Sequence, residues 1–260
     1  MYIFNRLDSI ELDPIFLPHL KQVDTNTIFE EFKSSTTFDK YLNKLSTMRV
    51  IDDEGGVNPG DRLAIYFLIQ HFKPTSILEI GTHIGASTVY IASSLKKLMS
   101  SDTSYFPKLI TVDIKNVNDV KIKPWLSFNS SHSPLELIQQ ISCEEFVTFI
   151  VANSLEYLGT CRNKFDFIFL DGDHSASYVY QEIAIATKLL NKDGQLLLHD
   201  YYPDSKPLWK ETKPIKGPFL AVERLKSEGV DIIAKPLGKL PWITKKNSEL
   251  TSLALIGTNH

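Results

Sequence analysis

Short apolar runs alternate with longer amphipathic segments along most of the chain. Five runs have the length and continuity of buried parallel strands: SILEI, KLITVD, VTFIV, FDFIFLD and QLLLH, at 76–80, 108–113, 147–151, 165–171 and 195–199. Two further strands are expected within 230–235 and 251–257. Helical patterns cover 61–72, 85–99, 134–144, 175–190 and 219–229. This alternation predicts an α/β fold with a doubly wound, mostly parallel sheet.

The first 60 residues do not share this pattern. They contain isolated apolar clusters at 15–17 and 28–29, and they end in a loop-rich stretch at 52–60. A segment of this length is too short to bury a core of its own. We therefore predict an N-terminal helical cap or lid over 1–60 and a main domain over 61–260.

Composition narrows the class of protein. Hydrophobic residues make up 43% and charged residues 23% of the chain, which is an ordinary globular mixture and excludes wholesale disorder. The formal net charge of −3 argues against a nucleic-acid partner and fits a neutral or sugar-like small molecule. The two cysteines, Cys143 and Cys161, are too few for a disulfide framework or a zinc cluster.

Targeting signals do not stand out in the sequence. The first 13 residues already carry four charges, and no apolar stretch is long enough to span a bilayer. The expectation is a cytoplasmic protein with no membrane partner. The sequence leaves open whether the chain forms a homo-oligomer.

The residues that follow the strands carry the candidate chemistry, because ligands of a doubly wound sheet bind beyond the carboxyl ends of its strands. The first strand leads into EIGTHIGAST (79–88), where Gly81 permits a tight turn and Gly85 lets the chain approach a ligand. The spacing G-x-x-x-G differs from the dinucleotide pattern G-x-G-x-x-G. Glu79 also suits a cationic amino-acid end better than a diphosphate. The alternative to a ligand-binding loop at 79–88 is an ordinary strand-to-helix turn.

Acidic residues follow three other strands. Asp113, after the second strand, can accept hydrogen bonds from both hydroxyls of a ribose. Asp171 and Asp200 follow the fourth and fifth strands, whose ends lie side by side in such a sheet. Two carboxylates beside a cleft form an oxygen site suited to Mg²⁺. In the alternative, one of them meets an ammonium group or a helix amino terminus, and no metal binds.

Taken together, the motifs ILEIGTHIGAST, TVD and FIFLDGDHS resemble those of class I S-adenosylmethionine-dependent methyltransferases, and the resemblance covers most of 61–260. It implies a Rossmann-like sheet of seven strands and S-adenosylmethionine as the cofactor. It also implies that the cofactor lies against the glycine loop and the ends of the second, third and fourth strands, which here supply Glu79, Gly81, Gly85, Ser87, Asp113, Asn153, Ser154 and Asp171.

The segments DGDHS (171–175) and HDY (199–201) are similar to those of macrocin- and mycinamicin-type sugar O-methyltransferases, and more distantly to those of catechol-type enzymes. This similarity implies Mg²⁺ held at Asp171 and Asp200, with His199 where those enzymes have a second acid. It implies His174 as the general base, with Asp171 beside it as a catalytic residue. The expected reaction is methyl transfer from S-adenosylmethionine to a hydroxyl of a sugar or natural-product acceptor.

Two alternatives stay open at this point. Metal-independent N- or C-methylation of a small molecule would need only a neutral nucleophile and a polar pocket. The second alternative is a non-catalytic subunit that only binds the cofactor. The intact DGDHS and HDY segments count against this alternative, because binding alone does not require them. The loop 201–218 and the predicted cap are expected to shape the acceptor pocket, which a single sequence does not specify.

Overall fold

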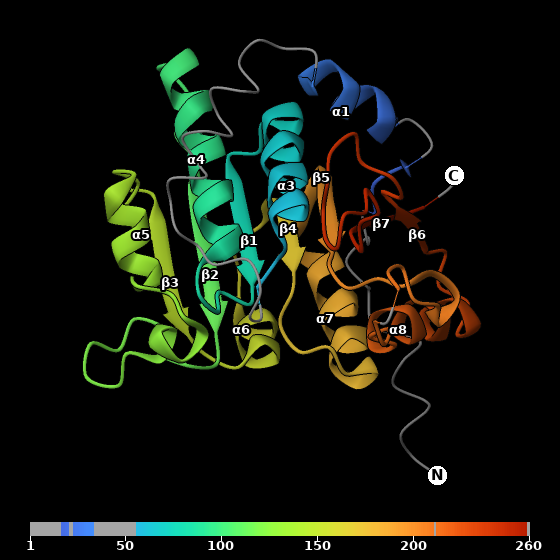
Figure 1. Ribbon diagram of the computed structural model, residues 1–260. Helices are drawn as coiled ribbons and strands as arrows, with labels where there is room; N and C mark the ends of the chain where they lie inside the picture. Colours follow the sequence, from blue (N-terminus) through green and yellow to red (C-terminus); the bar gives the residue numbers. More distant parts are fainter. Residues whose placement is uncertain (1–16, 21–22, 34–55, 211, 259–260) are drawn as a thin grey trace.

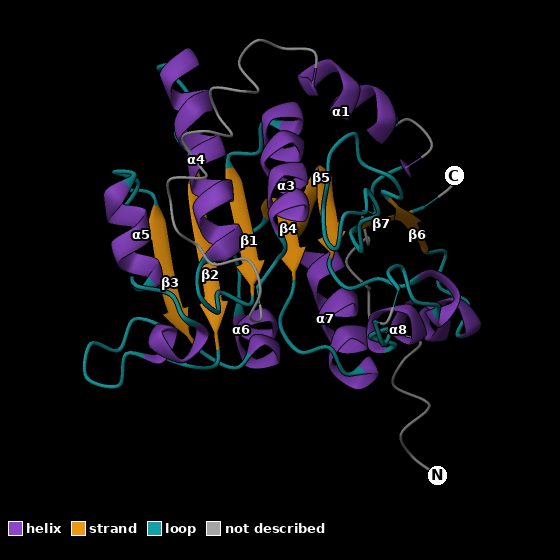
Figure 2. Cartoon of the chain, viewed as in Figure 1, coloured by secondary structure: helices purple, strands orange, loops and turns teal. Residues whose placement is uncertain are grey.

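A central sheet with helices on both of its faces forms the body of the protein (Figures 1 and 2). The computed structural model describes residues 17–20, 23–33, 56–210 and 212–258. The described helices are α1 (Thr25–Lys33), α3 (Pro59–Phe72), α4 (Ala86–Ser101), α5 (Pro134–Gln140), α6 (Ser154–Thr160), α7 (Ala176–Leu189) and α8 (Gly217–Ser227), with short 3₁₀ turns at Pro124–Phe128 and Pro203–Ser205. The strands are β1 (Ser76–Ile80), β2 (Lys108–Asp113), β3 (Val147–Val151), β4 (Phe165–Leu170), β5 (Leu190–Leu198), β6 (Ile233–Pro236) and β7 (Ala254–Gly257).

The seven strands lie in the order β3-β2-β1-β4-β5-β7-β6. The first five in this order are parallel, whereas β7 runs antiparallel to β5 and β6. At the centre, Ile80 at the end of β1 pairs with Val112 of β2 on one side and Leu170 of β4 on the other. The strand order reverses direction here, and a crevice at such a switch point is the usual ligand site of an open α/β sheet.

Burial on both faces explains why the parallel strands read as continuous apolar runs. Ile77, Phe167 and Phe169 belong to a core with residues of α3 and α4. Their neighbours along the strands, such as Leu78 and Ile168, belong to a second core with residues of α7 and α8. The alternation of side chains along each strand thus sends equally apolar residues into two helical layers. The predicted α/β fold with seven mostly parallel strands is confirmed.

The largest differences between the predicted and the observed elements concern α5, β5 and α6. The helix predicted over 134–144 ends at Gln140, and Ser142 in the following turn has a φ of 52°. The strand predicted over 195–199 begins at Leu190, because extended backbone resumes directly after α7 and pairs with Phe165 across a register shift. Helix α6 has no predicted counterpart, since its seven residues are too few for a periodic pattern.

The described part of the N-terminal region packs onto the main domain. Ile28 and Phe29 of α1 belong to the core beneath α3 and α4. Leu20 N–H donates to the carbonyl of Thr258 at 3.0 Å, and Thr258 N–H donates to that of Pro18 at 2.9 Å. The rest of the predicted cap over 1–60, at 1–16, 21–22 and 34–55, lies outside the described residues. The division at residue 60 therefore stays a prediction. None of the described helices combines the length and apolar character needed to cross a bilayer.

Candidate active site

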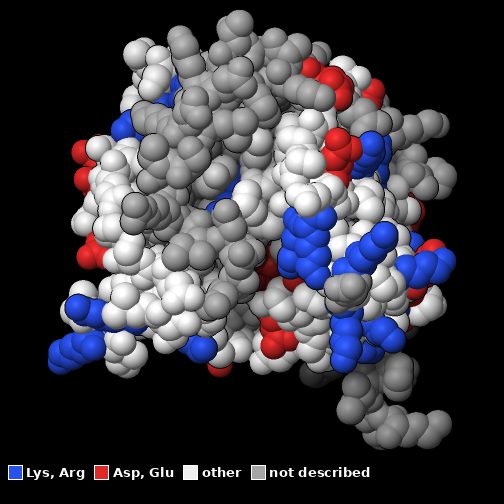
Figure 3. Space-filling model, viewed as in Figure 1, with Lys and Arg blue, Asp and Glu red and all other residues white. Residues whose placement is uncertain are grey.

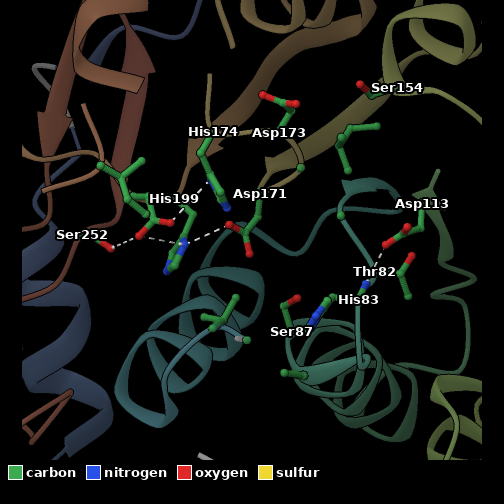
Figure 4. A pocket seen from close by; sticks show the side chains of 18 of the residues that line it. Thr82, His83, Ser87, Asp113, Ser154, Asp171, Asp173, His174, His199 and Ser252 are labelled. Carbon is green, nitrogen blue, oxygen red and sulfur yellow. Dashed lines mark hydrogen bonds and ion pairs between the residues drawn. The ribbon is translucent and has the colours of Figure 1, made fainter. Parts of the chain in front are cut away.

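A cavity of about 610 Å³ opens at the carboxyl ends of the five parallel strands β1 to β5. Figure 4 shows side chains of these strand ends facing it from several directions. Most of the residues predicted from the sequence line it: Gly81, Ser87, Asp113, Asn153, Ser154, Asp171, His174, His199 and Asp200. The two that do not are Glu79, in β1, and Gly85, at the start of α4. The fold thus brings together residues from the ends of five strands.

Two glycines shape the turn after β1. Gly81 has a φ of 99°, and a Cβ at this position would lie 2.0 Å from the carbonyl oxygen of Asp171. Gly85 has a φ of 77° and precedes α4, with Pro134 2.9 Å from where its Cβ would be. Both positions therefore require glycine for conformation and for space. The G-x-x-x-G spacing encodes a backbone that passes close to the end of β4.

Glu79 supports this turn from within the core. Its side chain is fully buried, and Thr88 Oγ1 donates to its Oε2 at 2.6 Å. Burial raises the pKa of Glu79 from 4.5 to about 7, against the opposing effect of the hydroxyls of Ser87 and Thr88. Glu79 thus links β1 to the first turn of α4.

Asp113 connects the end of β2 to the glycine turn. Its Oδ2 accepts a hydrogen bond from the backbone N–H of His83 at 2.8 Å, and its Oδ1 accepts one from Lys115 N–H at 2.9 Å (Figure 4). The imidazole of His83 packs edge-on against Phe128, with ring centroids 4.2 Å apart. Because each carboxylate oxygen can accept more than one hydrogen bond, Asp113 keeps free capacity toward the cavity.

Asn153 and Ser154 form the wall beside Asp113. The Asn153 side chain caps α6 by accepting from Leu155 N–H at 3.0 Å, and its Nδ2 lies 3.4 Å from the hydroxyl of Tyr178. Ser154 Oγ donates to Glu182 Oε1 at 2.5 Å. Burial raises the pKa of Glu182 to about 7. Both predicted residues are thus held in fixed orientations by neighbouring elements.

An acidic and imidazole cluster forms the opposite end of the cavity. His199 Nδ1 lies 2.9 Å from Asp171 Oδ1 and 3.6 Å from Asp200 Oδ1. Asp200 has a φ of 52°, and its Oδ2 lies 3.5 Å from His174 Nδ1. Figure 4 shows His174, Asp171 and His199 directed toward one another. The structure therefore brings together all four residues that the sequence placed at this end.

The cluster extends to a residue that the sequence analysis did not assign to the site. His199 Nε2 lies 3.3 Å from Oδ2 of Asp61, which is fully buried near the start of α3. Both nitrogens of the ring therefore face carboxylate oxygens, which only accept hydrogen bonds, and this favours an imidazolium. Burial lowers the pKa of His199, but Asp171 and Asp200 outweigh that effect and raise it well above its ordinary value.

The donor set tests how well this cluster suits Mg²⁺. Ligand atoms of Asp171, His174 and Asp200 lie within 4.8 Å of one another, so the three could hold a divalent ion. Imidazole nitrogen suits Mn²⁺, Co²⁺ or Zn²⁺ better than Mg²⁺, which prefers oxygen. A protonated His199 has no lone pair for a metal and competes with a cation for the two carboxylates. The residues present therefore fit a divalent ion in number but do not favour magnesium.

Further residues that line the cavity come from segments far away in the sequence. Tyr202 and Trp209 follow β5, with ring centroids 5.9 Å apart and nearly perpendicular planes. Lys213 and Lys245 line the cavity from two different loops. For this part of the cavity, the sequence predicted only that the loop 201–218 helps to shape the acceptor pocket. Nothing in the local pattern marked Asp61 or Lys245 as site residues.

Comparison with known proteins agrees with this geometry. Residues 78–201, which contain the glycine turn and the acidic cluster, match the family model of a methyltransferase domain. The chain is 24% identical over 169 residues to a rhamnosyl O-methyltransferase of Mycobacterium tuberculosis, and the match covers 62% of this chain and 59% of that relative. The chain is thus similar to methyltransferase domains over 78–201, and it matches little more than half the length of this relative.

Solved structures share the fold at low sequence identity. The O-methyltransferase TomG from Streptomyces achromogenes, in complex with S-adenosylmethionine, has a TM-score of 0.54 and 17% identity, with 90% of this chain and 97% of that chain covered. An O-methyltransferase from Bacillus cereus, in complex with S-adenosylhomocysteine, has a TM-score of 0.53 and 16% identity over 91% and 93% of the two chains. These similarities support the architecture of the sheet and its helices.

Proposed function

We propose that this protein transfers a methyl group from S-adenosylmethionine to a hydroxyl group of a small molecule. The observation that carries the proposal is one cavity with two different ends. One end has the glycine turn and Asp113, and the other has His174 paired with Asp200. The first suits the S-adenosyl compounds named in two similar structures, S-adenosylmethionine in one and S-adenosylhomocysteine in the other, and the second suits removal of a proton from an acceptor.

In this proposal each end of the cavity has a defined task. Asp113 accepts hydrogen bonds from the ribose, Asn153 and Ser154 flank the adenine, and the turn at Gly81 admits the methionine part. When bound, the cofactor supplies an electrophilic methyl group on its sulfonium. The protein contributes positioning of the acceptor in line with that methyl, which lowers the entropic part of the barrier.

His174 is the proposed general base. Its Nδ1 faces Asp200, so a proton on Nδ1 leaves Nε2 free to take the proton of a hydroxyl. Asp200 then stabilises the imidazolium that forms. Asp171 orients the imidazole of His199, which it contacts, beside this pair. Metal assistance, with Asp171, His199 and Asp200 as ligands, stays a prediction of the sequence resemblance.

Cofactor binding is the first test. S-adenosylhomocysteine should raise the melting temperature of the protein in a dose-dependent way, whereas NAD should leave it unchanged, because only a ligand that binds the folded state stabilises it. A shift with NAD and none with S-adenosylhomocysteine would contradict the proposal.

Catalysis is tested with His174→Ala and the control His132→Ala, whose side chain lies outside the cavity. Formation of S-adenosylhomocysteine is followed with a panel of glycosides and phenols. We expect His174→Ala to lose at least about 100-fold in rate with unchanged cofactor binding, and His132→Ala to behave as the wild type. Full activity of His174→Ala would remove His174 from the base role. Activity that persists after thorough chelation, without a response to Mg²⁺ or Mn²⁺, would exclude metal assistance.

A further inference from the structure

The open side of the cavity carries positive charge, although the protein as a whole is slightly acidic. Figure 3 shows basic side chains gathered beside a hollow in which acidic side chains are visible. The residues that line the cavity include Asp171, Asp173 and Asp200, which follow β4 and β5, and the exposed lysines Lys213 and Lys245 from two other loops. A net charge of −3 over the chain therefore conceals a strong local separation of charge.

Lys213 and Lys245 form no ion pair with the described part of the protein, although Lys245 is near enough to Asp200 to attract it electrostatically. No carboxylate oxygen of the described residues lies within ion-pair distance of either ammonium group, whereas other lysines of the same two segments are paired. Lys206 lies 3.1 Å from Asp204, and Lys239 lies 2.6 Å from Glu249. Two unpaired ammonium groups at the rim of one cavity make a site for an anion.

A third donor lies beside them. Trp209 is 5% exposed and lines the cavity, and its indole N–H has no hydrogen-bond partner among the described residues. Lys245 Nζ lies 5.6 Å from the centroid of the Trp209 ring, so the indole holds this ammonium group at the rim. All three side chains are donors without acceptors, which calls for a ligand group rich in oxygen and negative charge.

We propose that the acceptor carries a phosphoryl group, which Lys213 and Lys245 bind beside Trp209 while the reacting hydroxyl points toward His174. This inference rests on the proposed function and names the substrate class of the same site. The charge separation would orient the acceptor, because the acidic inner wall repels the phosphoryl end and the lysines attract it. A lysine ammonium binds phosphate as a point charge and tolerates several phosphate geometries.

The test compares two double variants that remove the same charge from the same two segments. Lys213→Gln/Lys245→Gln removes the unpaired lysines, and Lys206→Gln/Lys239→Gln removes paired lysines that do not line the cavity. Each full-length protein is saturated with S-adenosylhomocysteine, and binding of inorganic pyrophosphate, uridine diphosphate and uridine is measured by calorimetry. Saturation keeps these probes out of the cofactor end.

We expect the wild type and the control to bind pyrophosphate and uridine diphosphate but not uridine. The Lys213→Gln/Lys245→Gln variant should bind both at least about tenfold more weakly, since hydrogen bonds to charged groups are lost. Tighter binding of uridine diphosphate than of pyrophosphate would assign the group to a nucleotide-linked acceptor, and the reverse to a simple phosphate ester.

Three results would overturn the inference. They are absence of pyrophosphate binding by wild-type protein that binds S-adenosylhomocysteine, equal binding by the two double variants, or tighter binding of a single-stranded oligonucleotide than of any small probe. Failure to bind S-adenosylhomocysteine would instead contradict the proposed function, so the two failures are distinguishable.

Discussion

At the scale of single residues, His199 defines the character of the site. Its ring lies between carboxylates on both sides, with Asp171 at 2.9 Å from Nδ1 and Asp61 at 3.3 Å from Nε2. A buried imidazolium compensated by carboxylates is a fixed positive charge at the position where the resemblance places an acidic metal ligand. The residue therefore changes both the charge and the donor chemistry of this end of the cavity.

The first prediction concerns the turn at Gly81. Gly81→Ala should lower the free energy of unfolding by more than about 2 kcal/mol and abolish binding of S-adenosylhomocysteine, because a Cβ here meets a backbone oxygen and the φ is positive. Gly159→Ala is the control, since nothing lies within 4 Å of its Cβ, and alanine favours helix α6 by up to about 1 kcal/mol. Urea denaturation and calorimetry measure both effects. Similar behaviour of the two variants would contradict the prediction.

The second prediction concerns the pH dependence that Glu79 imposes on stability. Its pKa is about 7 in the folded protein and 4.5 in the reference state. The folded state thus holds a proton that the unfolded state releases, so this stabilisation is present below about pH 4.5 and is lost as the pH rises through about 7. The free energy of unfolding of the ligand-free wild type, relative to Glu79→Gln, should fall by about 3 kcal/mol over that window. A pH-independent difference in urea denaturation would contradict it.

At the scale of elements, the residues at the N-termini of helices hold side chains of the site in position. Asn58 caps α3 by accepting from Asp61 N–H at 3.0 Å, and its Nδ2 donates to Asp61 Oδ2 at 2.7 Å. The same carboxylate oxygen faces His199. The cap of one helix is thereby part of the support of the acidic cluster.

The third prediction compares two helix caps. Asn58→Ala should lower the free energy of unfolding by about 2 kcal/mol or more, because it removes a cap and leaves the buried Asp61 without one of its hydrogen bonds. Ser133→Ala removes only the capping box of α5 and should cost about 1 kcal/mol. Urea denaturation of both variants measures the difference, and equal losses would show that the Asn58–Asp61 bond does not contribute.

Elements differed in how far the sequence predicted them. The strands β1, β2 and β3 match their predicted residues, because each is a short, mainly apolar run, although β3 lies at the edge of the sheet and is only partly buried. Helix α6 was missed because its seven residues are too few for a periodic pattern, although Asn153 caps two of its backbone N–H groups. The ends of α5 and β5 depend on a positive φ and a register shift, and neither leaves a periodic signal.

At the scale of the whole molecule, the described N-terminal helix is part of the main core. Phe29 is 1% exposed, and its ring meets Trp242 edge to face with centroids 5.4 Å apart. Trp242 in turn donates through Nε1 to the carbonyl of Gly60 at 2.9 Å. Residues from the two ends of the chain therefore share one apolar layer over α3.

The fourth prediction follows from this shared layer. Phe29→Ala should lower the free energy of unfolding by about 3–5 kcal/mol, because the ring leaves a cavity between α1 and the rest of the core. Phe106→Ala, at a side chain that is 75% exposed, should change it by less than about 0.5 kcal/mol. Far-ultraviolet dichroism and tryptophan fluorescence should report one shared transition for Phe29→Ala. A separate early transition would show that α1 unfolds independently.

The sequence by itself determined the sheet, the glycine turn and the acidic residues at the strand ends. Each of these is encoded locally, by the apolar periodicity of a strand or by a backbone conformation that only glycine adopts readily. Tertiary structure alone decided that Asp61 faces His199, 138 residues away, and that Lys213 and Lys245 line the same cavity. The reason is physical: local pattern records which side chains are buried, whereas the path of the folded chain decides which distant charges become neighbours.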